Sequence, residues 1–334
     1  MRAITVDDFV TDLLDLKVRD NIPTPKPQKA NDILVKVTDV GVTHVDTLYV
    51  QVKPPALTLG TEFAGTVVTS SSSELKAGDR VYGGGLGSYA EYICVDASNV
   101  RKVPSQWTNA EACAVSNSGP VSYGALVSMG GLVAGETVLI LGASGGLGVM
   151  AIQIAKAIGA KVIALVGNGE KARMVLELGA DAAVDYHEVR WEDRVRALTD
   201  DGEGVHLVYD AIGAVESGLK CLRYRGRLVI VGFAARGGVM EKVAMNRILL
   251  KSATVHGYRY GEDGRRDPKR TEEVWNGFMK LVSQGAIKPV TFSKGGYQGL
   301  SSIPRALEDV KENKTWGRVV VEEIDVDDSR KAKL

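Results

Sequence analysis

The sequence predicts an α/β fold in which a doubly wound parallel sheet is joined to a second, strand-rich domain. Three patterns support this prediction: strand–turn–helix–strand over residues 138–166, short apolar runs alternating with helical segments over residues 122–256, and β-prone runs separated by Pro, Gly and Asn-Asp before about residue 120. At 334 residues the chain exceeds the usual size of one hydrophobic core. We therefore expect two domains.

The turn inside residues 138–166 carries the functional signal. It follows an apolar run typical of a central parallel strand and reads GASGGLG over residues 142–148, a G-x-G-x-x-G dinucleotide fingerprint with Ala143 in place of the first glycine. Gly145 lets the backbone approach a pyrophosphate, and Gly148 lets the next helix lie close to the strand. The N-terminal amides of that helix face the phosphates. This predicts a Rossmann-type unit; an ordinary tight turn is the alternative.

The end of the second strand indicates which nucleotide binds. An NAD site places Asp or Glu there, about 20 residues beyond the glycines, to hold the ribose 2′-hydroxyl. Here residues 166–169 read VGNG, with no acid, and the cations Lys171 and Arg173 follow, with Glu170 as the opposing charge. Because Lys and Arg hold phosphates, this favours the 2′-phosphate of NADP; a solvated helix start is the alternative.

Composition excludes several classes of function. Lys+Arg and Asp+Glu are equal at 41 each, so charge gives no case for binding nucleic acid or an anionic membrane. The cysteines Cys94, Cys113 and Cys221 lack C-x-x-C spacing, so we expect reduced core residues and neither a disulfide framework nor a cysteine-rich zinc lobe.

Three sequence patterns bear on where in the cell the protein is found. The N-terminus has no secretory pattern, and no stretch approaches the 18 or so apolar residues that a membrane helix needs. We therefore expect a cytoplasmic protein. The C-terminal Ala332-Lys333-Leu334 differs by one residue from the peroxisomal S-K-L address, which leaves a peroxisomal location open; a charged, solvated tail is the simpler explanation.

We expect residues 122–257 to form the nucleotide-binding domain and residues 1–121 with 258–334 to form the other domain. The last predicted strand, near residues 317–323, has no covered partners of its own. It is therefore expected to return to the first domain.

Ordered motifs along nearly the whole chain resemble the medium-chain dehydrogenase/reductase superfamily, and within it the zinc-independent quinone oxidoreductases related to zeta-crystallin. Besides the glycine turn they are GV at residues 41–42, GTEFAG at 60–65, AGDRV at 77–81, GSYAEY at 87–92 and WGRVV at 316–320. The resemblance implies a GroES-like catalytic domain beside the Rossmann domain.

The resemblance also implies which positions of this chain correspond to the zinc ligands of related enzymes. Zinc-dependent alcohol dehydrogenases of the superfamily place their ligands where this chain has Thr43, Thr61 and, by a looser match, Asn117. Threonine and asparagine are poor zinc ligands, so no metal is expected. Without a Lewis acid to hold an alkoxide, reduction of an activated acceptor is favoured.

The resemblance implies an NADPH:quinone oxidoreductase, with alkenal or enone double-bond reduction as the alternative. A different class, a structural or nucleotide-regulated binding protein, also stays open. Thr43, Asp46 and Tyr49 are the catalytic candidates, with Tyr49 the foremost hydroxyl donor. The related reductases commonly have Asn-Phe at Thr43-His44 and a tyrosine at Leu48.

For the cofactor, the resemblance carries over residues at the pyrophosphate, the 2′-phosphate and the nicotinamide side. They are His44, Ala143, Ser144, Gly145, Gly146, Leu147, Gly148, Lys171, Tyr186, Gly213, Gly232, Phe233, Ala234, Gly257 and Tyr258. The implied partner is a small quinone or activated alkene, with no nucleic acid or membrane. A homodimer through the sheet edge around Thr254 is implied as well.

Overall fold

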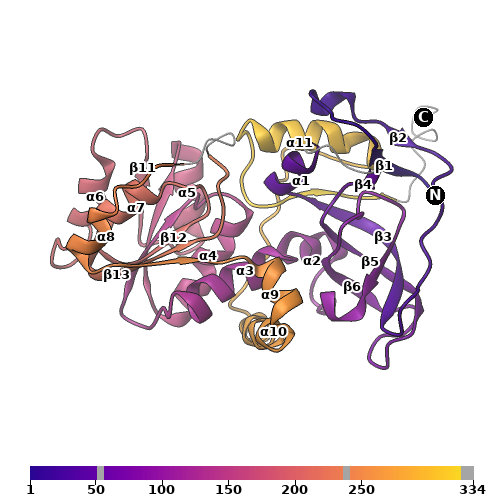
Figure 1. Cartoon of the computed structure of the whole chain (residues 1–334), viewed down its shortest axis with the longest axis horizontal. Coiled ribbons are helices and arrows are strands. Elements are labelled where there is room, and N and C mark those ends of the chain that lie inside the picture. Colours follow the sequence, from indigo (N-terminus) through magenta and orange to yellow (C-terminus); the bar gives the residue numbers. More distant parts are fainter. Residues whose placement is uncertain (51–55, 236–240, 325–334) are drawn as a thin grey trace. The chain divides into compact units, whose positions relative to one another are not determined.

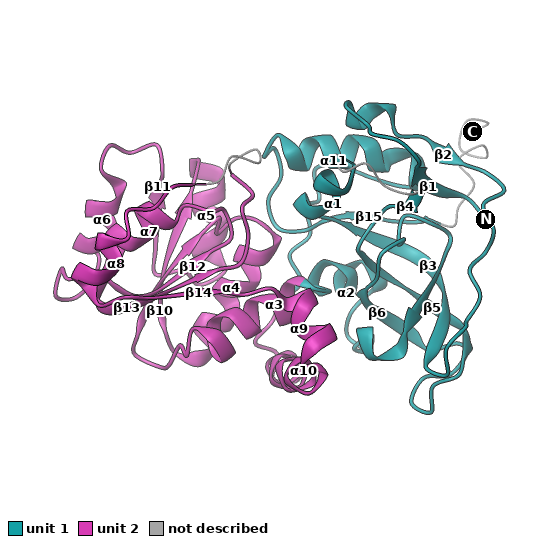
Figure 2. Cartoon of the chain, in the orientation of Figure 1, with its two compact units in different colours: residues 1–117, 289–334 teal, residues 118–288 magenta. Residues whose placement is uncertain are grey.

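The computed structural model describes residues 1–50, 56–235 and 241–324 (Figure 1). The chain forms two compact units, one of residues 1–117 with 289–334 and one of residues 118–288 (Figure 2). We call them unit 1 and unit 2. The C-terminal tripeptide Ala332-Lys333-Leu334 lies outside the described residues. Within those residues, no helix combines the length and apolar character of a membrane span.

Unit 2 contains the predicted doubly wound sheet. Its six strands run in the order β11-β10-β9-β12-β13-β14, and every neighbouring pair is parallel. From β9 the chain extends the sheet first to one side and then to the other, so the topological switch lies between β9 and β12. The strands are β9 (Thr137–Leu141), β10 (Lys161–Val166), β11 (Ala182–Asp185), β12 (Val205–Asp210), β13 (Leu222–Ile230) and β14 (Thr254–Gly257).

The helices of unit 2 follow these strands in the alternation that the sequence predicts (Figure 1). Because β9 is buried along its whole length, its last four residues, 138–141, form an unbroken apolar run. The helices are α3 (Ser118–Tyr123), α4 (Gly146–Ile158), α5 (Gly169–Glu177), α6 (Trp191–Ala197), α7 (Val215–Cys221), α8 (Asn246–Lys251), α9 (Tyr260–Arg266) and α10 (Pro268–Ser283), with a π-helical turn at Gly124–Met129.

Residues 258–288 belong to unit 2, whereas the sequence analysis places them in the strand-rich domain. The physical reason is the packing of α10, which buries Val274, Trp275 and Phe278. The ring of Phe278 lies so close to Gly119 of α3 that a Cβ there would be 2.2 Å from it. The structural units therefore divide after residues 117 and 288.

Unit 1 is built on antiparallel sheets. Strand β3 is central: it pairs with β5, β7 and the last strand, β15, which returns to unit 1 as the sequence predicts. A small sheet has the order β2-β1-β4, and the larger one β15-β3-β5-β6-β8. The strands are β1 (Ala3–Val6), β2 (Val18–Arg19), β3 (Asp32–Val42), β4 (Leu57–Thr58), β5 (Glu62–Ser70), β6 (Arg80–Gly84), β7 (Tyr92–Asp96), β8 (Val100–Lys102) and β15 (Val319–Val321).

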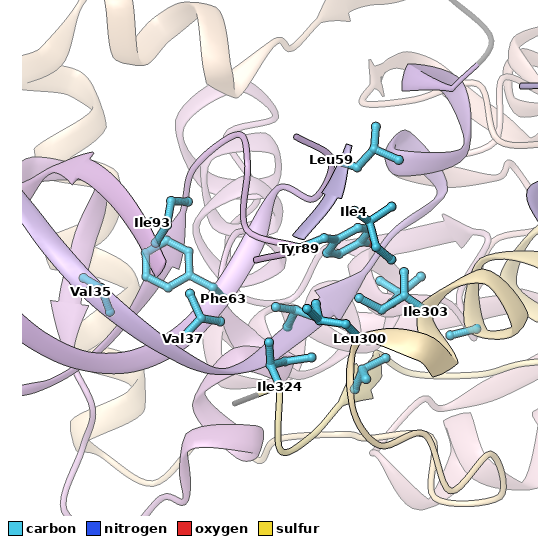
Figure 3. Close-up of a cluster of buried hydrophobic side chains, with 14 of the residues drawn as sticks. Ile4, Val35, Val37, Leu59, Phe63, Tyr89, Ile93, Leu300, Ile303 and Ile324 are labelled. Carbon is cyan, nitrogen blue, oxygen red and sulfur yellow. The ribbon is translucent and has the colours of Figure 1, made fainter. Parts of the chain in front are cut away.

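One hydrophobic cluster joins the sheets and helices of unit 1. Figure 3 shows part of this cluster, in which Tyr89 lies beside Ile4 and α11 contributes Ile303. The backbone links the first two, since the Ile4 amide donates to the Tyr89 carbonyl over 2.9 Å. The helices are α1 (His44–Tyr49), α2 (Asn109–Val115) and α11 (Ile303–Lys311), with short 3-10 turns at Leu13–Asp15, Ala97–Asn99 and Leu300–Ser302.

Candidate functional site

The glycine turn of unit 2 forms an open cradle at the start of α4. Gly142 has a φ of 75°, which favours glycine, and Gly145 is the N-cap of α4, where no side chain bonds to the first-turn amides. A Cβ at Gly145 would meet only the Gly142 carbonyl oxygen, at 3.6 Å. The cradle therefore has room and backbone donors for a phosphate.

Close packing behind the cradle explains the last glycine. A Cβ at Gly148 would lie 2.3 Å from the Gly142 oxygen and 2.5 Å from Ala143. Ala143 itself is fully buried. The absence of a side chain at Gly148 thus lets α4 begin in close contact with the turn that follows β9.

Two buried hydroxyls that the sequence analysis missed support the same turn. Ser122 of α3 donates to the Leu147 carbonyl over 3.0 Å, and its oxygen lies 3.0 Å from the hydroxyl of Tyr209 on β12. Both residues are buried. Nothing local in the sequence identifies this contact, because the three residues come from three separate elements.

The tip of β10 is the second part of the candidate site. Asn168 caps α5 by accepting from the Lys171 amide over 2.9 Å, and burial lowers the pKa of the Lys171 ammonium. The hydroxyl end of Tyr186 lies against Gly167, where a Cβ would be 2.4 Å from it. The structure therefore brings Tyr186, which follows β11, to the end of β10. Asn168 and the start of α5 come directly after Gly167 in the chain.

The predicted nicotinamide residues in unit 2 lie beyond the ends of β12 and β13. The Asp210 carboxylate accepts from the Ile212 amide at 3.0 Å and the Gly213 amide at 2.9 Å, which shapes a turn where Gly213 has a φ of 78°. A Cβ on Gly213 would be 2.8 Å from the ring of Phe233. Gly232 and Ala234 flank this half-exposed ring.

Gly257 is the last residue of β14, and Tyr258 directly follows it. Gly257 is exposed, whereas Tyr258 is buried, and its hydroxyl contacts Gly124 at the start of the π-helical turn. Burial raises the pKa of the Tyr258 phenol. Tyr258 thus packs inside unit 2.

Thr43 and Asp46 form a reciprocal capping box in unit 1. The Asp46 carboxylate accepts from the Thr43 amide and hydroxyl, both over 2.8 Å, and Thr43 accepts from the Asp46 amide over 3.3 Å. Asp46 also accepts from Tyr89 over 2.9 Å and Thr61 over 3.0 Å. Burial raises the pKa of Asp46, and these hydrogen bonds act against that rise. Asp46 and Thr43 therefore anchor the start of α1.

The other predicted residues of α1 have different surroundings. Tyr49 is half-buried and packs against the hydrophobic core of unit 1. Its hydroxyl takes no part in the capping box. Burial lowers the pKa of the half-buried His44 imidazole, which favours its neutral form.

Sequence reasoning also missed a buried ion pair in unit 1. Arg318 places one guanidinium nitrogen 3.3 Å from Oε1 of Glu62 and its Nε 3.1 Å from Oε2, and both side chains are buried. The Nε–Oε2 approach is an ion pair and not an aligned hydrogen bond. Burial raises the pKa of Glu62 to about 7, against the effect of Arg318. The two residues are 256 positions apart, so no local pattern pairs them.

Thr43, Thr61 and Asn117, which stand at the positions compared with the zinc ligands of alcohol dehydrogenases, hydrogen-bond to other groups of unit 1. Thr61 donates to Asp46, and the Asn117 amide donates to the Thr61 carbonyl over 3.4 Å. Across the described part of the chain, no group of three or more His, Cys, Asp or Glu residues is placed to hold a metal ion.

Comparison with known proteins identifies the family. A model described as "Zinc-binding dehydrogenase" matches residues 146–283, and one described as "Alcohol dehydrogenase GroES-like domain" matches residues 29–105. Quinone oxidoreductase-like protein 2 of Bos taurus is 31% identical over 313 residues, which cover 89% of this chain and 87% of the relative. The chain belongs to the quinone oxidoreductase-like proteins of the medium-chain dehydrogenase/reductase superfamily.

Other relatives agree with this membership in the quinone oxidoreductase-like proteins. Quinone oxidoreductase 1 of Escherichia coli is 31% identical over 306 residues, covering 88% of this chain and 92% of the relative. The structure of Escherichia coli quinone oxidoreductase complexed with NADPH matches with a TM-score of 0.85 at 28% identity, covering 96% of this chain and 100% of that one. A mycobacterial protein complexed with NADPH matches with a TM-score of 0.85 at 30% identity, covering 96% and 99%.

Proposed function

We propose that this quinone oxidoreductase-like chain reduces quinones with hydride from NADPH and without zinc. The observation that carries the proposal is the open cradle at the start of α4, next to a β10 tip that ends without an acid. The two relatives whose structures contain NADPH support the same cofactor. The names of the sequence relatives support quinones as acceptors.

The residues of the cradle fit the pyrophosphate of NADPH. The Gly145 amide donates to the Gly142 carbonyl within the turn, so the amides of residues 146–148 are the ones that donate to the pyrophosphate, and the missing side chain of Gly145 gives the phosphates space. At the β10 tip, Lys171 and Tyr186 hold the 2′-phosphate. When bound, NADPH supplies the hydride.

The remaining cofactor residues orient the nicotinamide and the phosphates. Gly213 and Phe233 form a contact beyond β12. Gly232, Ala234, Gly257 and Tyr258 are assigned to the same side of the cofactor by the resemblance. His44 is proposed to serve the phosphates as a neutral imidazole. Each of these roles is part of the proposal.

The residues of unit 1 support the proposal that a quinone accepts the hydride. Thr43, Thr61 and Asn117 offer no thiolate or imidazole, so reduction of an acceptor that needs no Lewis acid is favoured. Because Thr43 and Asp46 hydrogen-bond to each other, we assign them the positioning of α1 and assign Tyr49 the donation to the acceptor oxygen. Water can supply the remaining proton.

We also propose a cytoplasmic homodimer. Thr254 is exposed and begins β14, the edge strand of the described sheet in unit 2, where a second copy can extend the sheet. Size-exclusion chromatography with light scattering tests this: a mass of two chains supports the dimer, and a mass of one chain contradicts it.

The test of function compares acceptors. The purified protein is given NADPH with 1,4-benzoquinone, with 2-alkenals, or with no acceptor, and oxidation of NADPH is followed. We expect oxidation that depends on the quinone. Turnover with 2-alkenals but no quinone would replace the proposal by double-bond reduction, and NADPH binding without any turnover would indicate a non-catalytic protein.

A further inference from the structure

A carboxylate lies at the tip of β11, next to the position assigned to the 2′-phosphate. Asp185 ends β11 in parallel register with Val166, the last residue of β10, and its side chain is 39% exposed. A carboxylate in this region repels a phosphate and suits a ribose 2′-hydroxyl. Asp185 on its own would therefore favour the nucleotide without the 2′-phosphate.

His187 engages this carboxylate twice. Oδ1 of Asp185 accepts from the His187 amide over 2.9 Å and lies 2.8 Å from Nδ1 of the imidazole. The amide, followed by the imidazole, lowers the pKa of Asp185, so the carboxylate remains ionised. Because an ionised carboxylate only accepts, Nδ1 must carry the proton in this contact.

The same imidazole lies against the ring of Tyr186. The two ring centroids are 4.3 Å apart, with the planes tilted by 40°. The hydroxyl end of the Tyr186 side chain lies against Gly167, directly after β10. The backbone amide of Tyr186 donates to the Val166 carbonyl over 3.0 Å. Asp185, His187 and Tyr186 thus form one connected group beside the β10 tip.

We propose that His187 determines the preference for a 2′-phosphate by pairing with Asp185 and presenting Nε2 to the phosphate. Donation to both anions requires a proton on each ring nitrogen, so the proposal includes an imidazolium that offsets the carboxylate and adds a charge-assisted donor. The other charged groups on these two segments are those of α5 and of the residues directly after β11, namely Glu170, Lys171, Arg173, Glu177, Glu188 and Arg190. This proposal rests on the proposed use of NADPH. In it, His187 keeps the Asp185 carboxylate from repelling the 2′-phosphate.

The test uses two adenosine nucleotides that need no hydride chemistry. Dissociation constants of 2′,5′-ADP and 5′-AMP are measured by calorimetry on the full-length protein, the variants His187→Ala and Asp185→Asn, and the double variant. We expect His187→Ala to weaken 2′,5′-ADP about five- to tenfold, as loss of one charge-assisted contact does, and 5′-AMP less than twofold. In the double variant, the part of the loss that comes from repulsion by the unpaired carboxylate should be recovered, whereas the part that comes from the missing imidazole donor should remain.

The matched control is Arg190→Ala, which removes an exposed cation that pairs with Asp193 further along the same segment. It should change both constants less than twofold. Equal losses of both ligands in His187→Ala, or no recovery in the double variant, would overturn the inference and leave NADPH use intact. If the unmodified protein binds neither nucleotide, the proposed function fails together with it.

Discussion

The Tyr89 hydroxyl donates to Oδ2 of Asp46 over 2.9 Å, and both side chains are fully buried. This contact ties α1, which carries three of the predicted site residues, to the segment before β7. Since Asp46 accepts from Tyr89, Thr61 and Thr43, its hydrogen bonds favour a positioning role for this carboxylate. Its direct part in catalysis remains a prediction.

Tyr89→Phe should destabilise unit 1. The change removes one donor to a buried carboxylate, which costs about 1–3 kcal/mol of unfolding free energy. Urea unfolding measures this cost. The matched control is Tyr92→Phe, at a half-buried position on β7, where we expect a change within about 0.5 kcal/mol. Equal small changes in both variants would contradict the importance of the Asp46 contact.

Glu62 should make stability depend on pH. Its pKa rises from 4.5 to about 7 on burial, so in that window the folded state binds more protons than the unfolded state. The stabilising contribution is therefore present below pH 4.5 and is lost as the pH rises to about 7, by at most about 1.4 kcal/mol per unit.

Glu62→Gln tests this dependence by urea unfolding at pH 5 and pH 8. The stability of the variant relative to the unmodified protein should improve at the higher pH, by up to about 3 kcal/mol. The control Glu74→Gln, at an exposed position, should show the same difference at both values. A pH-independent difference for Glu62→Gln would contradict the raised pKa.

Gly148→Ala should disrupt the cradle. The new Cβ meets the backbone of Gly142 and Ala143 at 2.3 and 2.5 Å, so α4 must move away from β9. We expect a loss of about 1–3 kcal/mol in unfolding free energy and weaker NADPH binding. The control Gly261→Ala on α9, where no atom lies within 4 Å of the new Cβ, should be neutral or slightly stabilising. Unchanged NADPH affinity in Gly148→Ala would remove the cradle from the site.

Lys171→Glu should discriminate between nucleotides. Reversing this charge repels a 2′-phosphate, so the dissociation constant for NADPH should rise at least about tenfold and that for NADH less than about threefold. Fluorescence titration measures both. Arg173→Glu makes the same charge change at an exposed position of α5, and a smaller effect is expected there. Equal losses for both nucleotides in Lys171→Glu would contradict its assignment.

Local patterns predicted the parts of the fold that local physics determines. The strand–turn–helix–strand at β9, α4 and β10 follows from an apolar run and the glycines of the turn, and the return of β15 to unit 1 follows from a strand left without partners. The assignment of residues 258–288 differs because it depends on how α10 packs on α3.

The candidate site also combines features that depend on local sequence with contacts that depend on the fold. Motifs predicted Thr43, Asp46 and the glycines of the cradle as site residues, and each of these predictions depends on a short segment of sequence. The contacts of Asp46 with Tyr89 and of Glu62 with Arg318 join residues 43 and 256 positions apart. Only the folded sheet decides such pairs, so they could not be predicted from spacing.

The most direct test of the central claim is cofactor preference with 1,4-benzoquinone as acceptor. Initial rates give kcat/KM for NADPH and for NADH with the same purified protein. We predict quinone-dependent oxidation with NADPH favoured by at least about tenfold, which corresponds to about 1.4 kcal/mol in transition-state stabilisation. Equal or better turnover with NADH would contradict it.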